Sequence, residues 1–189
     1  MDKFKCILLA LIVSISGCAF STKNNITNYE STGNLESPKP SGCVEISGLT
    51  NQQNPVDIFT GLNKCLADGT YSKAANLYLV GMSYGYYDTK RVSDRTAHQA
   101  ISVLRMNVFG SQSNDRLNLL QTEVTKLTSN NNEICEGLKN LGKPAYKPTY
   151  MIQHGMGAFT DQNTKDGLVE KFNAQQAWKD AISKIVRCV

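Results

Sequence analysis

The residues with the most recognisable chemical spacing are a serine and its two flanking glycines. Residues 81–85 read Gly-Met-Ser-Tyr-Gly, which matches the G-x-S-x-G pattern of a nucleophilic serine that works with a histidine and an acid. That chemistry requires Ser83 at a sharp turn between a strand and a helix. The residues before Gly81 have helical spacing, so we expect Ser83 to lie within a helix without an activated hydroxyl. No catalytic residue is predicted, and a serine hydrolase is the least favoured function.

The two histidines of the chain do not form a metal-binding pattern. His98 lies beside the apolar stripe of a predicted helix, which favours a bond from its ring to a backbone or tyrosine group. His154 lies in a loop rich in aromatic residues. No two cysteines after residue 42 have the short spacing of a zinc site. We therefore predict no metal and no cofactor.

Two segments are dense in aromatic and charged residues, namely the loop 144–159 and the turn expected at residues 84–95. Both fall where predicted helices stop, and interfaces draw most of their energy from a few Tyr, Trp or Arg side chains. We predict that they form one docking surface, with Tyr150 and Arg91 as its anchors. The alternatives are a loop that closes the core and a solvated, salt-bridged turn. The candidate partner-binding residues are Tyr84, Tyr87, Asp88, Arg91, Arg95, Tyr146, Tyr150, His154, Met156 and Phe159.

The N-terminus has the pattern of a signal peptide. Lys3 and Lys5 precede the apolar run 6–13, and small residues follow it. A membrane-spanning helix needs about 20 apolar residues, so this run is too short to remain as a membrane anchor. We therefore predict that residues 1–17 are removed on export.

The leader ends in Ile-Ser-Gly-Cys at residues 15–18, which resembles the lipobox of bacterial lipoproteins. The resemblance implies that Cys18 becomes the first residue, with a diacyl group on its sulfur and an acyl group on its nitrogen. Several acyl chains anchor a protein stably, whereas one holds it weakly. Ala19, where an Asp would imply retention at the inner membrane, implies the outer membrane, facing the periplasm. The alternative is an ordinary cleaved signal in which Cys18 is incidental.

The exported chain enters a compartment that oxidises thiols. Its remaining cysteines are Cys43, Cys65, Cys135 and Cys188, and four cysteines allow three connectivities. We expect one or two disulfides. A bond between Cys65 and Cys135 is favoured, because both lie on the apolar faces of predicted helices.

Composition divides the chain into three parts: a signal peptide over 1–17, a lipidated Cys and flexible tether over 18–42, and one helical domain over 43–189. The tether is rich in Ser, Thr, Asn, Gly and Pro, and as a flexible coil it would hold the domain about 25–30 Å from the membrane. The formal net charge of the whole chain is only +4. This is too small to indicate nucleic acid as a partner.

Apolar residues at helical spacing, with capping residues at the expected ends, predict an all-α fold, a compact irregular bundle of about six helices that bears disulfides. The first two helices loosely resemble the hairpins of tetratricopeptide-type proteins, but no second copy follows at a fixed period. Gly81 and Gly85 would let another helix approach closely. The predicted helices run from Pro55, capped by Asn54, to Gly69; from Ser72 to Tyr87; from Ser93 as cap to Gly110; from Ser113 as cap through Leu127; from 130–132 to Gly142; and from Asn173 as cap through Val186.

No motif of the chain specifies a reaction, so we predict a non-enzymatic periplasmic binding lipoprotein. A lipobox, a tether and a small disulfide-bearing helical domain together resemble toxin-immunity lipoproteins. That resemblance implies a protein partner, an incoming toxin such as a type VI secretion lipase or amidase, in addition to the membrane reached through Cys18. The alternative of another class is an envelope assembly or scaffold lipoprotein.

Overall fold

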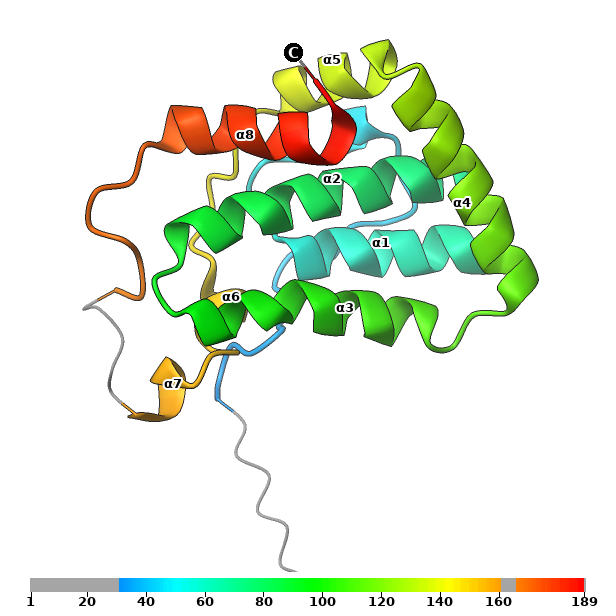
Figure 1. Ribbon diagram of the computed structural model, residues 1–189. Helices are drawn as coiled ribbons and strands as arrows, with labels where there is room; N and C mark the ends of the chain where they lie inside the picture. The colour runs from blue at the N-terminus through cyan, green and yellow to red at the C-terminus, as the bar shows by residue number, and fades with distance from the viewer. Residues whose placement is uncertain (1–30, 161–165, 189) are drawn as a thin grey trace, which may run out of the picture.

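A computed structural model describes residues 31–160 and 166–188, and this part of the chain is all-α (Figure 1). It contains eight α-helices rather than about six, because the loop after α5 holds two helices of four residues each. Within the described ranges the only β pairing is an isolated bridge between Val92 and Leu168. None of the described helices is both long and apolar enough to cross a membrane. The elements are η1 (Ile46–Gly48), α1 (Pro55–Ala67), α2 (Tyr71–Arg91), η2 (Arg95–Gln99), α3 (Ala100–Phe109), α4 (Asn114–Ser129), α5 (Asn132–Leu141), α6 (Thr149–Ile152), α7 (Gly157–Thr160) and α8 (Ala174–Val186), where η denotes a 3₁₀ helix.

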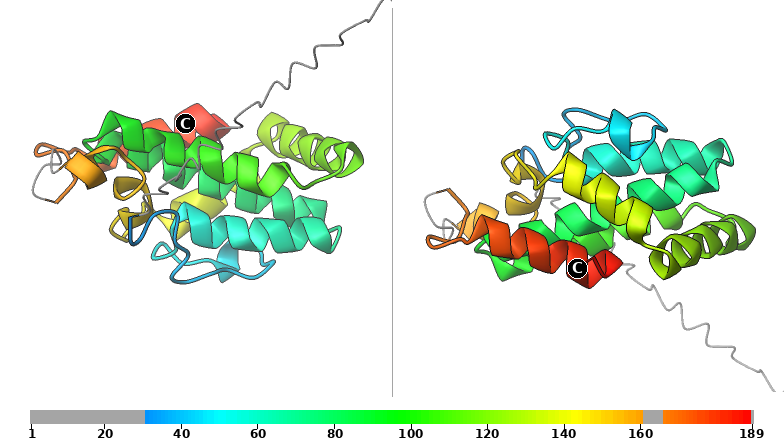
Figure 2. Two further views of the ribbon diagram at one scale, coloured as in Figure 1. Left: turned by 90° about the horizontal axis from the view of Figure 1, so that it is seen from below. Right: turned by 90° about the horizontal axis from the view of Figure 1, so that it is seen from above.

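Helix α2 is the centre of the bundle. It contacts α1, α4 and α8, and it runs antiparallel to α1, α3 and α8 (Figure 1). Seen from above, α1 and α8 flank α2, and α5 packs on α8 (Figure 2). Leu77, Val80 and Tyr84 of α2 are fully buried. The hydrophobic core therefore surrounds α2 on several sides.

The two glycines of the G-x-S-x-G segment allow neighbouring side chains to reach the α2 backbone. A Cβ atom on Gly81 would overlap the ring of Phe59 from α1, and one on Gly85 would overlap the side chain of Ile101 from α3. The predicted close approach at these glycines is confirmed, and it involves two different helices.

Several helix ends lie where the sequence predicts them. The Asn54 side chain accepts from the Asp57 N–H, and the Asp57 carboxylate accepts from the Asn54 N–H, which completes a capping box at the start of α1. Ser113 and Asn173 cap α4 and α8 in the predicted way. Helix α5 ends at Leu141 and is followed by the predicted Gly142, whose φ of +80° favours glycine.

The connection between α2 and α3 differs from the prediction. Helix α2 continues through Arg91, beyond the expected end at Tyr87. Ser93 is not the cap, because the next helical segment, the 3₁₀ helix η2, is capped by Asp94, which accepts from the Thr96 N–H. The N–H of Ser93 donates to the Gly167 carbonyl. Residues 84–91 are therefore helical and do not belong to a turn.

Half of the predicted tether lies on the domain. The N–H of Leu35 donates to the Tyr150 carbonyl, and Asp57 Oδ1 accepts from Ser37 Oγ and the Lys39 N–H at 2.8 Å each. Asp57 is fully buried, and these donors satisfy its carboxylate beyond the capping box. The tether prediction is wrong for residues 31–42. Residues 1–30, which include the predicted signal peptide and Cys18, lie outside the described part.

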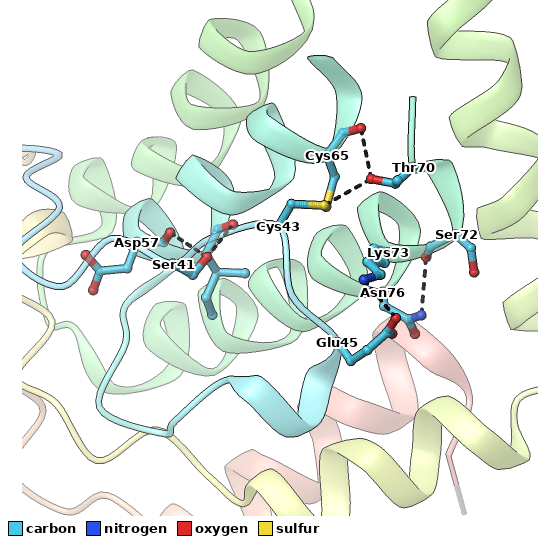
Figure 3. Close-up of a disulfide and its surroundings, with 10 residues drawn as sticks. Ser41, Cys43, Glu45, Asp57, Cys65, Thr70, Ser72, Lys73 and Asn76 are labelled. Carbon is cyan, nitrogen blue, oxygen red and sulfur yellow. Dashed lines mark hydrogen bonds and ion pairs between the residues drawn. A yellow bond between two sulfur atoms is a disulfide. The ribbon is translucent and has the colours of Figure 1, made fainter. Parts of the chain in front are cut away.

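The four cysteines form two disulfides, as predicted, but the favoured bond between Cys65 and Cys135 is wrong. Cys43 pairs with Cys65 and Cys135 pairs with Cys188. In each bond a cysteine within a helix pairs with a cysteine outside the helices. Cys65 of α1 pairs with Cys43, which precedes η1. Cys135 of α5 pairs with Cys188, which follows α8, the helix on which α5 packs. Figure 3 shows Cys43 beside α1, with the hydroxyl of Thr70 at 3.0 Å from its sulfur.

Candidate functional site

The ten residues predicted for partner binding do not form one surface. Four of them lie on α2 and a fifth lies on α6, and all five are buried. The prediction that Arg91 and Tyr150 are exposed anchors is wrong, because Arg91 is 9% exposed and Tyr150 is 1% exposed. The alternative, a loop that closes the core, is correct for Tyr150. The buried residues are Tyr84, Tyr87, Asp88, Arg91 and Tyr150; Tyr146 and His154 are half-buried; Arg95, Met156 and Phe159 are exposed.

Asp88 is the centre of a buried polar network between α2 and the loop after α5. Its Oδ1 accepts from Nε of Arg91 at 2.7 Å, and its Oδ2 accepts from the hydroxyls of Tyr146 and Tyr150 at 2.8 Å each. Asp88 has no exposed surface. Hydrogen bonds to a charged group are about twice as strong as neutral ones. The network therefore holds the rings of Tyr146 and Tyr150, which belong to the loop after α5 and to α6, against α2.

Burial sets the protonation of this network. Burial raises the pKa of Asp88, whereas the Arg91 charge and the tyrosine hydroxyls act in the opposite direction. Burial and the charge of Asp88 raise the pKa values of Tyr146 and Tyr150 well above the usual range. Both hydroxyls consequently keep their protons and remain donors to the carboxylate.

The Arg91 guanidinium lies between aromatic rings. It is 5.1 Å from the ring centre of Tyr87 and 5.0 Å from that of Tyr146, within the range of cation–π attraction. Its buried Nη2 has no hydrogen-bond partner among the described residues. The spacing of Asp88 and Arg91 along the chain, three residues, was a signal for this pair. The sequence predicts that the segments with Asp88 and with the two tyrosines meet, but nothing in it indicates that the tyrosines donate to a buried carboxylate.

Tyr146 and Tyr150 also line a cleft of about 440 Å³. Its other walls come from residues 33–39, from the residues before α1 and from residues 145–149. Lys39 and Lys147, both exposed, belong to this lining and form no ion pair with the described residues. Glu36 is the acidic residue of the lining, and it accepts from the Gly33 N–H. The cleft thus combines the half-buried, fixed ring of Tyr146 with two ammonium groups that form no ion pair with the described residues, while Tyr150, 1% exposed, offers almost no surface to a ligand.

This arrangement suits binding of an acidic group. The half-buried ring of Tyr146 offers rigid apolar contact, and the lysines attract a carboxylate. The Tyr146 hydroxyl already donates to Asp88, so toward a ligand it offers only oxygen lone pairs. Recognition of an acidic side chain of a partner would therefore depend on Lys39 and Lys147. Sequence reasoning missed both lysines: Lys39 falls in the predicted tether, and Lys147 falls in the loop 144–159, where only the aromatic residues, His154 and Met156 were selected.

The loop that carries Met156 is tied to the start of η2. The Asp94 carboxylate accepts from the Gly157 N–H at 2.7 Å, and the Thr96 hydroxyl accepts from the Met156 N–H at 2.8 Å. Partial burial alone would raise the pKa of Asp94, but hydrogen bonds from Thr96 and Gly157 outweigh burial and lower it. Nδ1 of His154 lies 2.9 Å from Oδ1 of Asn34, and burial lowers the pKa of His154.

Ser83 and His98, which were considered for catalysis and metal binding, are each hydrogen-bonded to a backbone carbonyl. Ser83 lies within α2, is fully buried and donates its hydroxyl to the Leu79 carbonyl at 2.8 Å. A strand–turn–helix junction, which the G-x-S-x-G pattern requires, is not present there. Nε2 of His98 lies 3.0 Å from the Val92 carbonyl, which confirms the predicted backbone partner. The described residues contain no group of three metal-ligating side chains.

Comparisons of this chain with protein-family models, with curated proteins and with solved structures found no match.

Proposed function

We propose that this protein is a periplasmic binding lipoprotein, anchored through Cys18, that binds a protein partner at the cleft beside Tyr146 and Tyr150. The observation that carries the proposal is the cleft itself, where Asp88 fixes the half-buried ring of Tyr146 and two exposed lysines form no ion pair within residues 31–160 and 166–188. The lipobox-like leader and the small disulfide-bearing domain support an immunity role. The partner is then an incoming toxin, such as a type VI secretion lipase or amidase.

Fixed tyrosines are favourable for tight binding. A side chain that loses rotamer freedom on association costs about 0.5–1.5 kcal/mol. The hydrogen bond from the half-buried Tyr146 to Asp88 has already removed that freedom in the free protein. An immunity protein must bind before the toxin acts, and a preformed cleft with attractive charge favours fast and tight association.

The immunity role is tested with the products of the genes next to that of this protein, because an immunity protein is expected to be encoded beside its toxin. Each product is sent to the periplasm of cells that lack this protein. We expect one of them to be toxic, and we expect the full-length protein to restore growth. If none is toxic, the immunity role fails, and an envelope scaffold becomes the better proposal.

Reversing both cleft charges is expected to abolish protection. Lys39→Glu with Lys147→Glu places two carboxylates where the partner's acidic group would bind, so the affinity for the toxin should fall at least about tenfold. Both side chains are exposed, so the melting temperature should stay near that of the wild type. Binding of the purified pair is measured by calorimetry at low and high salt.

The matched control is Lys171→Glu with Lys179→Glu, which makes the same charge change at exposed positions just before and within α8. The control should bind the toxin as the wild type does. Equal affinities of the two double variants would show that the cleft is not the binding site.

The lipid anchor has its own test. Metabolic labelling with palmitate should mark the wild type and should not mark Cys18→Ser, because the sulfur of Cys18 is the expected acceptor. Cys18→Ser should also leave the membrane fraction. Labelling of both proteins to the same extent would contradict the anchor and would leave the proposal for the cleft intact.

A further inference from the structure

Two large apolar side chains are exposed together on the loop after α6. Met156 is 61% exposed and Phe159 is 45% exposed, and they are three residues apart at the start of the short helix α7. The loop is held in place, because Asp94 and Thr96 accept the N–H groups of Gly157 and Met156. The two side chains therefore project from a fixed backbone.

The start of the described chain lies at the same end of the molecule. The hydroxyl of Ser31 donates to Oε1 of Gln153, directly after α6. Asn34 contacts His154, and Leu35 is hydrogen-bonded to Tyr150. In Figure 1 the blue segment that begins the described chain lies beside α6 and α7, far from α4. Figure 2 shows the same separation of α7 and α4.

The length of chain between Cys18 and Ser31 limits how the domain can face its membrane. Twelve residues, 19–30, separate them. Fully extended, this stretch spans at most about 45 Å, and a flexible chain of this length has an average span of about 20 Å. A domain of this size is about 40 Å across. At that average span, the end with Ser31, Met156 and Phe159 lies nearest the bilayer, because the opposite end of the domain is about 40 Å farther away.

A basic residue, Arg95, lies next to the segment that holds the backbone of Met156. Arg95 is exposed, and it forms no ion pair with the described residues. It is next in sequence to Thr96, the residue that holds the N–H of Met156. A guanidinium binds lipid phosphates through paired hydrogen bonds. Apolar side chains beside a cation are the pattern of proteins that rest in the interfacial layer of a membrane.

We infer that Met156, Phe159 and Arg95 form a membrane-contact surface, with Met156 and Phe159 inserted in the interfacial layer of the bilayer that holds the lipid of Cys18 and Arg95 on the phosphates. This inference rests on the proposed lipid anchor. It fixes the orientation of the domain: α7 faces the bilayer, and α4 points toward the periplasm.

The test uses the full-length lipidated protein, reconstituted into vesicles of phosphatidylethanolamine and phosphatidylglycerol. A polarity-sensitive fluorophore is attached to a cysteine introduced as Phe159→Cys, as Met156→Cys or, for the control, as Leu119→Cys. Leu119 is also exposed, at 49%, but lies on α4. We expect blue-shifted emission at 159 and 156, with quenching by nitroxide-labelled lipids, and no quenching at 119.

The possible results distinguish a failure of the membrane-contact surface from a failure of the lipid anchor on Cys18. Palmitate labelling first shows whether Cys18 carries lipid; a protein without lipid would remove the anchor and the inference with it. If lipidated protein shows equal quenching at 159 and 119, the anchor holds and the membrane-contact surface is wrong. If Met156→Ser with Phe159→Ser abolishes toxin binding in solution while the fluorescence shows no membrane contact, the surface binds the protein partner instead. Melting temperatures near that of the wild type confirm that every variant is folded.

Discussion

Replacing Asp88 with alanine is expected to lower the free energy of unfolding by about 3–5 kcal/mol, the usual cost of breaking a buried ion pair by removing one partner. The variant leaves the buried charge of Arg91 without its carboxylate and the hydroxyls of Tyr146 and Tyr150 without their acceptor. Each unsatisfied buried group adds a desolvation cost. The loss is measured from denaturant midpoints at neutral pH.

Smaller substitutions measure the contribution of each hydrogen bond to Asp88 separately. Tyr146→Phe and Tyr150→Phe each remove one hydroxyl and should cost about 1 kcal/mol. The matched control is Asp180→Ala, which removes an exposed carboxylate from α8 and should leave stability nearly unchanged. If Asp88→Ala unfolded at the same denaturant concentration as Asp180→Ala, the buried network would be refuted.

Removing the bond between Cys135 and Cys188 is expected to cost about 4 kcal/mol. This disulfide joins residues 53 apart in the sequence, whereas the bond between Cys43 and Cys65 joins residues 22 apart. A longer closed loop restricts the unfolded chain more, so the bond between Cys43 and Cys65, which closes the shorter loop, should contribute only about 3 kcal/mol. Cys135→Ala with Cys188→Ala should therefore unfold at lower denaturant than Cys43→Ala with Cys65→Ala.

Both pairs of variants are compared with and without a reducing agent. The wild type should lose stability on reduction by more than either double variant, since each double variant has only one bond left to lose. Peptide mapping without reduction should find Cys43 joined to Cys65 and Cys135 joined to Cys188. A peptide that joins Cys65 to Cys135 would contradict this connectivity.

The local features of this protein can be predicted from its sequence. The caps Asn54, Ser113 and Asn173 and the stop at Gly142 depend on hydrogen bonds and backbone angles within a few residues. The apolar periodicity determines the helical class, and the glycines at 81 and 85 mark where neighbours come close. The caps, the stop and the helical class need no knowledge of distant contacts, and the glycines mark a close approach without indicating which helix approaches. This explains why the sequence predicts these features correctly.

Only the tertiary structure decided which polar residues are buried and which cysteines pair. Asp88 is satisfied by hydroxyls 58 and 62 residues away, and those partners allow α2 to continue through a stretch that by itself is typical of a solvated turn. Residues 31–42 have the composition of a tether, yet they lie on the domain because the buried carboxylate of Asp57 accepts their donors. Cys135 meets Cys188 because α5 packs on α8. Each of these outcomes depends on desolvation and on contacts between distant segments, and neither composition nor periodicity contains that information.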